Sequence, residues 1–350
     1  MIMKAASSFL IFVLSAGINL AAGDFNAGAK GTTGAAFLTM GMGARALGMG
    51  EAYSAVAADA SAVSWNPAGL VRAPEISVMF MHANYLAGIS FDYLSFARSN
   101  GSSAFGGAVA YLNGGEVERT DEAGNNRGTY QPRDYAATIG YALDLEVFGA
   151  DSRKYGAGVA GKYLSSKIVE KAGVFAFDAG LTARTSVDDM TLRLAFVAQN
   201  LGGGIKLDKK ADPLPTTLKA GGALQLDKNW LISADVAAPR GNSPYICAGV
   251  EHAAYRDVNI RVLLRFGVNT LTLGDISGIT AVSGGFGLVI KNAAVDYAAV
   301  PFGDLGLTHR LSLTMRFGNA GNDPGGRVKR YGEKSAKKNS GGGKAPISIW

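Results

Sequence analysis

The sequence is poor in the residues that most enzymes use, with one cysteine and three histidines among 350 residues. Its single cysteine, Cys247, cannot form an internal disulfide. The histidines lie far apart in the chain and lack the spacing of metal ligands, and no P-loop, H-E-x-x-H or G-x-S-x-G motif is present. We therefore expect no catalytic residue, no metal and no cofactor, and a protein that is not an enzyme.

Long hydrophobic runs are also missing after Gly23, where no stretch reaches the roughly 18 apolar residues of a membrane-spanning helix. Before it, Lys4 precedes a short apolar stretch at 5–14, and small residues end the region. This order is typical of a signal peptide, here 1–23. An exported chain without a spanning helix is periplasmic, secreted or a membrane β-barrel.

Charge is scarce as well, at 18% of residues, and the net charge of +6 is unevenly placed. Beyond Phe317 the sequence has seven Lys or Arg against Asp323 and Glu333, so the body of the chain is nearly neutral. A nearly neutral body carries no basic footprint for nucleic acid. We expect 318–350 to form a basic, disordered periplasmic tail.

Alternation of apolar and polar residues dominates the chain from Glu75 onward. Between 258 and 266 every second residue is Val, Ile, Leu or Phe, and the intervening positions include Asn259, Arg261 and Arg265. The stretch 308–317 repeats the pattern. Apolar residues outside and polar residues inside are typical of a transmembrane β-barrel.

These patterns predict fourteen antiparallel strands that form a closed barrel over 75–317. Most have the length that a tilted strand needs to cross a bilayer, and an even number is usual for such barrels. The predicted strands are 75–83, 88–98, 103–113, 133–143, 155–166, 174–184, 190–200, 216–226, 230–238, 245–253, 257–266, 280–290, 293–300 and 308–317.

Several charged residues fall on the polar face of these strands and are expected to point into the lumen. A polar group inside a barrel needs a partner, so the arginines either fill a polar interior or form ion pairs with the two acids. The predicted lumen charges are Arg193, Arg261, Arg265, Arg310, Arg316, Asp178 and Asp235.

Connection lengths are unequal at the two ends of the predicted barrel. The long polar segments 114–132, 201–215 and 267–279 fall at one end, which we predict to be extracellular, and short turns fall at the other. Two connections, 84–87 and 144–154, break this asymmetry.

The segment from Gly31 to Leu70 is dense in glycine and has no strand pattern. Its glycines suit close backbone approach in a confined space. In Asn66-Pro67-Ala68-Gly69 the Asn side chain suits a helix N-cap, Pro the first helical position and Gly a left-handed exit. The sequence predicts one helical turn here.

This segment resembles the N-terminal signature of the PorV/PorQ family of bacterial outer-membrane proteins, which is related to FadL-type barrels for hydrophobic compounds. The matching pieces are Gly43-Ala44-Arg45-Ala46, Gly48-Met49-Gly50, Ala57-Ala58-Asp59-Ala60-Ser61-Ala62 and Trp65-Asn66-Pro67-Ala68-Gly69-Leu70. Where relatives often have two acidic residues, this chain has Ala58-Asp59.

The resemblance implies an outer-membrane barrel of fourteen strands, with 24–74 folded into or against its periplasmic mouth as a hatch. The hatch residues that it singles out are Gly43, Arg45, Gly48, Gly50, Asp59, Trp65, Asn66, Pro67 and Gly69. In this interpretation the segment acts either as a gate or only as a structural plug.

One motif points elsewhere, because Gly41-Met42-Gly43-Ala44-Arg45-Ala46 fits the G-x-G-x-x-A fingerprint of dinucleotide sites and Asp59 follows it. Such a site requires a strand before the motif and a helix after it within a βαβ unit. The alternating strands downstream provide no such unit, so no cofactor is predicted.

Three functions remain open for a barrel embedded in outer-membrane lipid. By resemblance, the protein is an interaction platform or shuttle that holds cargo of a type IX-like secretion system for surface attachment. Alternatively, it is a FadL-like channel for a hydrophobic small molecule, or a structural barrel that supports the envelope.

Overall fold

A computed structural model describes residues 24–145, 155–168, 170–187, 190–207 and 209–318. The predicted signal peptide 1–23 and the tail beyond Gly318 lie outside the described residues. Among the described residues, no helix is both long and apolar enough to cross a membrane.

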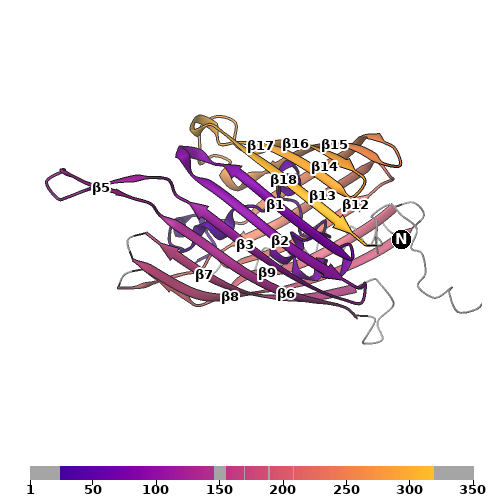
Figure 1. The fold of residues 1–350 in the computed structure, drawn as a ribbon, viewed down its shortest axis with the longest axis horizontal. Helices are drawn as coiled ribbons and strands as arrows, with labels where there is room; N and C mark the ends of the chain where they lie inside the picture. The colour runs from indigo at the N-terminus through magenta and orange to yellow at the C-terminus, as the bar shows by residue number, and fades with distance from the viewer. Residues whose placement is uncertain (1–23, 146–154, 169, 188–189, 208, 319–350) are drawn as a thin grey trace, which may run out of the picture.

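The chain forms a closed antiparallel barrel of fourteen strands, as predicted (Figure 1). Neighbours in the barrel follow the chain order, and β1 pairs with β18 to close it. The barrel strands are β1 (Ile76–Asn84), β2 (Ser90–Ser99), β3 (Ser103–Asn113), β6 (Arg133–Asp144), β7 (Tyr155–Lys167), β8 (Lys171–Val187), β9 (Met190–Gly202), β12 (Thr217–Gln225), β13 (Trp230–Pro239), β14 (Tyr245–Arg256), β15 (Ile260–Asn269), β16 (Val282–Ile290), β17 (Ala293–Pro301) and β18 (Leu307–Phe317).

Side chains alternate between the outer wall and the interior, as the sequence pattern predicted. In β18, Leu311 and Met315 are 54% and 42% exposed, whereas Ser312 and Thr314 are each 1% exposed. A wall with apolar side chains outside and buried polar side chains inside is the arrangement that a bilayer requires.

Two of the long connections contain short hairpins that the sequence did not predict. The first is β4 (Val117–Thr120) with β5 (Asn126–Tyr130), and the second is β10 (Gly204–Lys206) with β11 (Ala211–Pro213). The β4–β5 hairpin extends well beyond the barrel (Figure 1). We call this end of the barrel the loop end, and the opposite end, which includes 226–229 and 291–292, the turn end.

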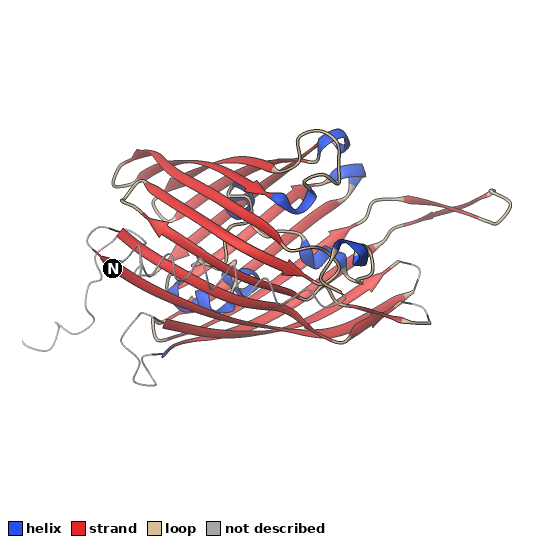
Figure 2. Ribbon diagram, turned by 180° about the vertical axis from the view of Figure 1, so that it is seen from behind, coloured by secondary structure: helices blue, strands red, loops and turns tan. Residues whose placement is uncertain are grey.

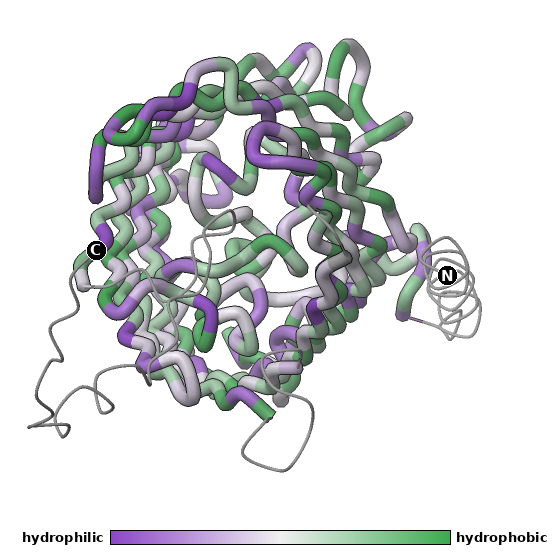
Figure 3. Tube along the Cα trace, turned by 90° about the vertical axis from the view of Figure 1, so that its right-hand side faces the viewer, coloured by the Kyte–Doolittle hydropathy of each residue, from purple (hydrophilic) through white to green (hydrophobic). Residues whose placement is uncertain are grey.

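The N-terminal segment, residues 24–73, begins at the loop-end rim, where residues 24–33 are largely exposed, and lies inside the barrel from Gly34 onward. Its short helices lie within the cylinder of strands (Figure 2), and the chain crosses the interior in the view along the barrel (Figure 3). They are the 3-10 helices η1 (Ala27–Ala29), η2 (Ala36–Thr39) and η3 (Pro67–Arg72) and the α-helices α2 (Ala44–Gly48) and α3 (Ala62–Trp65).

This segment runs along the interior rather than lying at one mouth. At the loop end, Lys30 forms an ion pair with Asp275 at 2.6 Å, and Gly34 donates its N–H to Pro213. At the turn end, the hydroxyl of Ser99 donates to the carbonyl of Val71. The segment therefore enters β1 at the end opposite to its own start.

Arginine substitutions on the lipid-facing side of β18 test the barrel arrangement, because the free-energy cost of a charge in the bilayer depends on its depth. Leu311→Arg, near the middle of β18, should lower the free energy of unfolding by about 2–4 kcal/mol, whereas Leu307→Arg at the strand end should cost about 0–1 kcal/mol. Urea unfolding of the protein folded in lipid vesicles measures both. Equal costs at the two positions would contradict the assigned bilayer face.

Candidate functional site

The predicted hatch residues come together inside the barrel, on α2, α3, η3 and the turns between them. Asn66, Pro67 and Gly69 are buried, and Trp65 and Asp59 are 3% and 4% exposed. Gly43 and Gly50 adopt left-handed φ values of 89° and 62°, which glycine tolerates without steric cost. Short glycine-rich turns thus let the segment fold back on itself within the lumen.

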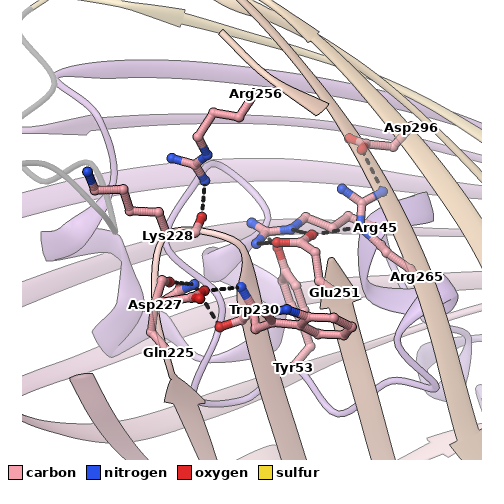
Figure 4. A network of polar contacts seen from close by, with 10 residues as sticks. All are labelled: Arg45, Tyr53, Gln225, Asp227, Lys228, Trp230, Glu251, Arg256, Arg265 and Asp296. Carbon is pink, nitrogen blue, oxygen red and sulfur yellow. Dashed lines mark hydrogen bonds and ion pairs between the residues drawn. The ribbon is translucent and has the colours of Figure 1, made fainter. Parts of the chain in front are cut away.

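A chain of ion pairs fixes this segment to the wall (Figure 4). Arg45 donates from Nε and Nη2 to the two carboxylate oxygens of Glu251 on β14, each at 2.8 Å. Arg265 on β15 donates from Nε to Glu251 at 2.7 Å, and its Nη1 lies 2.8 Å from an oxygen of Asp296 on β17. Removing one partner would leave a buried charge uncompensated, so this network is costly to break.

A second carboxylate, that of Asp235 on β13, holds the segment through its backbone. One oxygen of Asp235 accepts hydrogen bonds from the N–H groups of Tyr53 at 3.1 Å and Ser54 at 2.9 Å. Asp235 is 2% exposed. It therefore satisfies two backbone donors of a buried turn that has no strand partner.

The ion pairs differ from those expected for the lumen charges. Asp178 forms an ion pair with Lys162 at 2.7 Å and accepts from the N–H of Asn200, while Asp235 binds backbone. Arg265 instead pairs with Glu251 and Asp296. Of the two alternatives for the arginines, ion pairing with Asp178 and Asp235 is not what the structure has, because nearer groups of the segment and the wall occupy both acids.

The remaining predicted lumen charges are spread along the interior. Arg310 is 3% exposed, donates to the hydroxyl of Thr308 and lies over the ring of Tyr85 at 5.0 Å. Arg193, Arg261 and Arg316 are half-buried and line a cavity at the turn end. Arg265 lines the same cavity, so the structure brings four of the five predicted arginines together at the turn end and leaves Arg310, Asp178 and Asp235 apart from them.

The Asn66-Pro67 turn caps a helix, as predicted, but its glycine plays another part. The side-chain oxygen of Asn66 accepts from the N–H of Ala68 at 3.1 Å, and Pro67 opens η3. Gly69 lies within η3 and has no positive φ. A Cβ at Gly69 would lie 2.2 Å from the carbonyl oxygen of Ala57, so this glycine permits close backbone approach and is not a left-handed exit.

Three pairs of cross-strand glycines in the wall face the N-terminal segment, and the alternation pattern of the sequence did not predict them. They are Gly106 with Gly140, Gly158 with Gly180, and Gly249 with Gly267.

Each glycine pair forms a depression in the wall against which the N-terminal segment packs. A Cβ at Gly158 would lie 2.4 Å from the backbone of Pro67, and one at Gly267 would lie 1.9 Å from the backbone nitrogen of Gly50. A Cβ at Gly106 would meet the side chain of Leu70 at 2.8 Å. Glycine inside a strand signals close backbone approach, which is the signal that could have located these sites.

Two large cavities lie on either side of the segment. The cavity toward the loop end has a volume of about 360 Å³, and Met40, Met42, Trp65 and Tyr93 are among its lining residues. The other, toward the turn end, has a volume of about 410 Å³. In the described ranges, no group of three or more His, Cys, Asp or Glu residues could hold a metal ion.

The ring of Trp65 organises the segment at the loop-end cavity. Its Nε1 donates to the carbonyl of Met42 at 2.7 Å, its ring lies edge-on to Tyr53, and the ammonium of Lys219 lies 4.7 Å from the ring centre. Burial raises the pKa of the nearby Glu51 carboxyl, against the opposing effect of Lys219 and Arg310. The ionised carboxylate of Glu51 therefore destabilises the folded protein.

Removing a wall glycine should displace the segment. Gly267→Ala places a methyl group against the backbone of Gly50, and overpacking of this kind costs about 1–3 kcal/mol. Thermal unfolding and limited proteolysis of residues 36–73 measure the effect. Gly284→Ala in β16 is the control, because nothing lies within 4 Å of its added Cβ. Equal behaviour of the two variants would show that the segment is not fitted to the wall.

The raised pKa of Glu51 predicts a pH dependence. In the pH range between the ordinary and the raised pKa of this carboxyl, the folded protein holds more protons than the unfolded chain, so its stability falls as pH rises. Glu51→Gln should be the more stable protein at pH 7, and the difference should vanish below the ordinary pKa of glutamate. Thermal unfolding at pH 4 and pH 7 tests this. A variant less stable at pH 7 would contradict it.

Solved structures with the same fold include three barrels of low sequence identity. A toluene transporter of Ralstonia pickettii, TbuX, matches with a TM-score of 0.53 and 14% identity over 79% of this chain and 99% of that one. The CymD monoaromatic hydrocarbon channel matches with a TM-score of 0.52 and 13% identity, over 80% and 98%. The P. putida toluene transporter TodX matches with a TM-score of 0.50 and 14% identity, over 79% and 99%.

No curated protein matches the sequence. The model of one protein family, described as type IX secretion system protein PorV, matches residues 26–237. This match spans more than half of the chain and includes the N-terminal segment together with the barrel strands up to β13. The chain belongs to the PorV family of β-barrel proteins.

Proposed function

We propose that this protein is a non-enzymatic outer-membrane barrel that acts as an interaction platform, holding exported proteins for surface attachment in a type IX-like secretion route. The observation that carries the proposal is the projecting β4–β5 hairpin above a lumen that the N-terminal segment occupies. Membership of the PorV family supports it.

The hairpin offers a backbone surface to a partner. Among the described residues, its two strands pair with each other and with no barrel strand, which leaves the outer edges of both strands available to a partner. An extended segment of a cargo protein adds to such an edge as a further strand. Val117 on β4 is 37% exposed and adds apolar area to this surface.

Hydrogen bonds and an ion pair within the hairpin restrict its conformations. At its tip, Asp121 accepts from the N–H groups of Ala123 and Asn125 and forms an ion pair with Arg127 at 2.8 Å. At its base, Gly114 donates its N–H to the carbonyl of Pro132. A pre-organised edge loses less freedom on binding than a flexible loop.

Replacement of residues 116–130 by an Asn-Gly turn tests the platform. We expect the barrel to assemble at its normal level, and exported proteins to stop co-purifying with it. Pull-down from outer membranes followed by mass spectrometry measures both. The control, Glu118→Gln with Glu122→Gln, keeps the backbone edges and removes charge. If cargo co-purifies equally with the shortened barrel, the hairpin is not the platform.

The loop-end cavity favours a second function, passage of a small hydrophobic molecule. Its apolar lining of Leu38, Met40 and Met42 suits an aromatic hydrocarbon, the class of compound carried by the structurally similar barrels. In this case the segment acts as a gate.

Deletion of residues 31–72 distinguishes the two functions. If the segment is a gate, conductance in a planar bilayer and uptake of toluene should both rise. If conductance stays unchanged while cargo binding is lost, the platform is supported. Unchanged behaviour in both assays would favour a barrel that only supports the envelope.

A further inference from the structure

We propose that the turn end of the lumen contains a binding site for an anionic small molecule, with a phosphate or carboxylate group held between Arg184 on β8 and Arg193 on β9. The site lies between the N-terminal segment and the turn end of the barrel, away from the loop-end surface proposed to bind cargo. The proposal therefore does not depend on that function.

The two arginines face each other across the sheet. Arg184 and Arg193 are direct register partners, and both are half-buried. Arg184 lies on the same face of β8 as Gly180, which contacts Asn66 of the segment, so both side chains belong to the lumen side. Like charges directly opposite each other destabilise a strand pair unless an anion lies between them.

The surrounding charges leave this pair uncompensated. Three arginines, Arg184, Arg45 and Arg72, lie near enough to repel Arg193 electrostatically, and the carboxylate of Glu251 lies near enough to attract it. Glu251 is already bound by Arg45 and Arg265. Glu251 is therefore engaged elsewhere, Asp296 lies at Arg265, and Asp59 accepts from the N–H and hydroxyl groups of Ser61. Among the described residues, no ion pair joins these acids to Arg193, so the positive potential there remains.

A small cavity lies beside Arg184 and Arg193, and a hydroxyl group without a hydrogen-bond partner among the described residues lines it. Its volume is about 30 Å³, and its lining combines residues 55–58 of the N-terminal segment with Thr182, Arg184 and Arg193. The hydroxyl oxygen of Thr182 is buried and has no hydrogen-bond partner among the described residues. Two guanidinium groups and one hydroxyl are the donors that an oxyanion prefers.

The rest of the ligand has room beside this cavity. Arg193 also lines the turn-end cavity of about 410 Å³, whose lining has eight Lys or Arg side chains against four Asp or Glu side chains. The anionic group would lie between Arg184 and Arg193, with the remainder of the molecule in the larger cavity. The chain beyond Gly318 has an excess of positive charge, so its charge does not complement the basic lining of the turn-end cavity.

Thermal unfolding of the full-length barrel in a nonionic detergent tests the site. Sodium phosphate and sodium succinate are added separately, each compared with sodium chloride at the same ionic strength. We expect phosphate or succinate to raise the unfolding temperature above the chloride value. The ligand with the larger shift identifies the anionic group as phosphate or carboxylate, and isothermal titration should give one site per barrel.

Three variants locate the effect. Arg193→Gln and Arg184→Gln should abolish the shift, and Thr182→Val should reduce it while it keeps the shape of the wall. Arg98→Gln removes an exposed arginine at the same end of the barrel and should leave the shift unchanged. Without ligand and at low salt, Arg184→Gln should unfold at a higher temperature than the natural protein, because the like-charge contact is gone.

Two results would overturn the proposal. The first is an equal shift with chloride, phosphate and succinate, which would reflect general screening of charge. The second is a shift that persists in both Arg184→Gln and Arg193→Gln. If either variant fails to fold, the other and Thr182→Val decide the outcome.

Discussion

A bilayer offers no hydrogen-bond partners to a polypeptide backbone, and this constraint determines the whole architecture. Fourteen strands satisfy it by closing on themselves, since a closed sheet leaves no unpaired edge within the hydrocarbon. Closure creates an interior that must then be filled or left as a pore. In this protein the N-terminal segment occupies part of it, and the wall is adapted to the segment in both shape and charge.

The adaptation uses two kinds of contact with different roles. Glycine pairs such as Gly158 with Gly180 remove side chains where the backbone of the segment must approach the wall. Carboxylates, chiefly Glu251 and Asp235, supply the polar partners that buried arginine and backbone groups need. Shape complementarity sets where the segment lies, and the carboxylates make its displacement costly.

The barrel could be predicted from the sequence because the alternation of apolar and polar residues is a local property of each strand. A residue's position within a strand decides whether it meets lipid or lumen, so the strand 103–113 was predicted with the bounds that β3 has. The β4–β5 and β10–β11 hairpins escaped prediction because they are short and lie outside the bilayer, where no apolar face is required.

The partners of the lumen charges could not be predicted in the same way. Arg45 and Glu251 are separated by 206 positions in the chain, and nothing in the local pattern links them. The sequence indicated which arginines face inward, but pairing depends on the path of a segment that has no regular periodicity. Lys162 shows the same limit, since it takes the partner, Asp178, that was expected for an arginine.

The path of the N-terminal segment has a consequence for assembly of the barrel in the membrane. Residues 24–34 contact the loop end, whereas the same chain passes into β1 at the turn end. Pairing of β1 with β18 completes the cylinder around it. The segment contacts both strands of this seam, since Gly43 donates its N–H to the sulfur of Met81 on β1 and Ala44 donates to the hydroxyl of Ser312 on β18. Docking of the segment and sealing of the seam therefore stabilise each other.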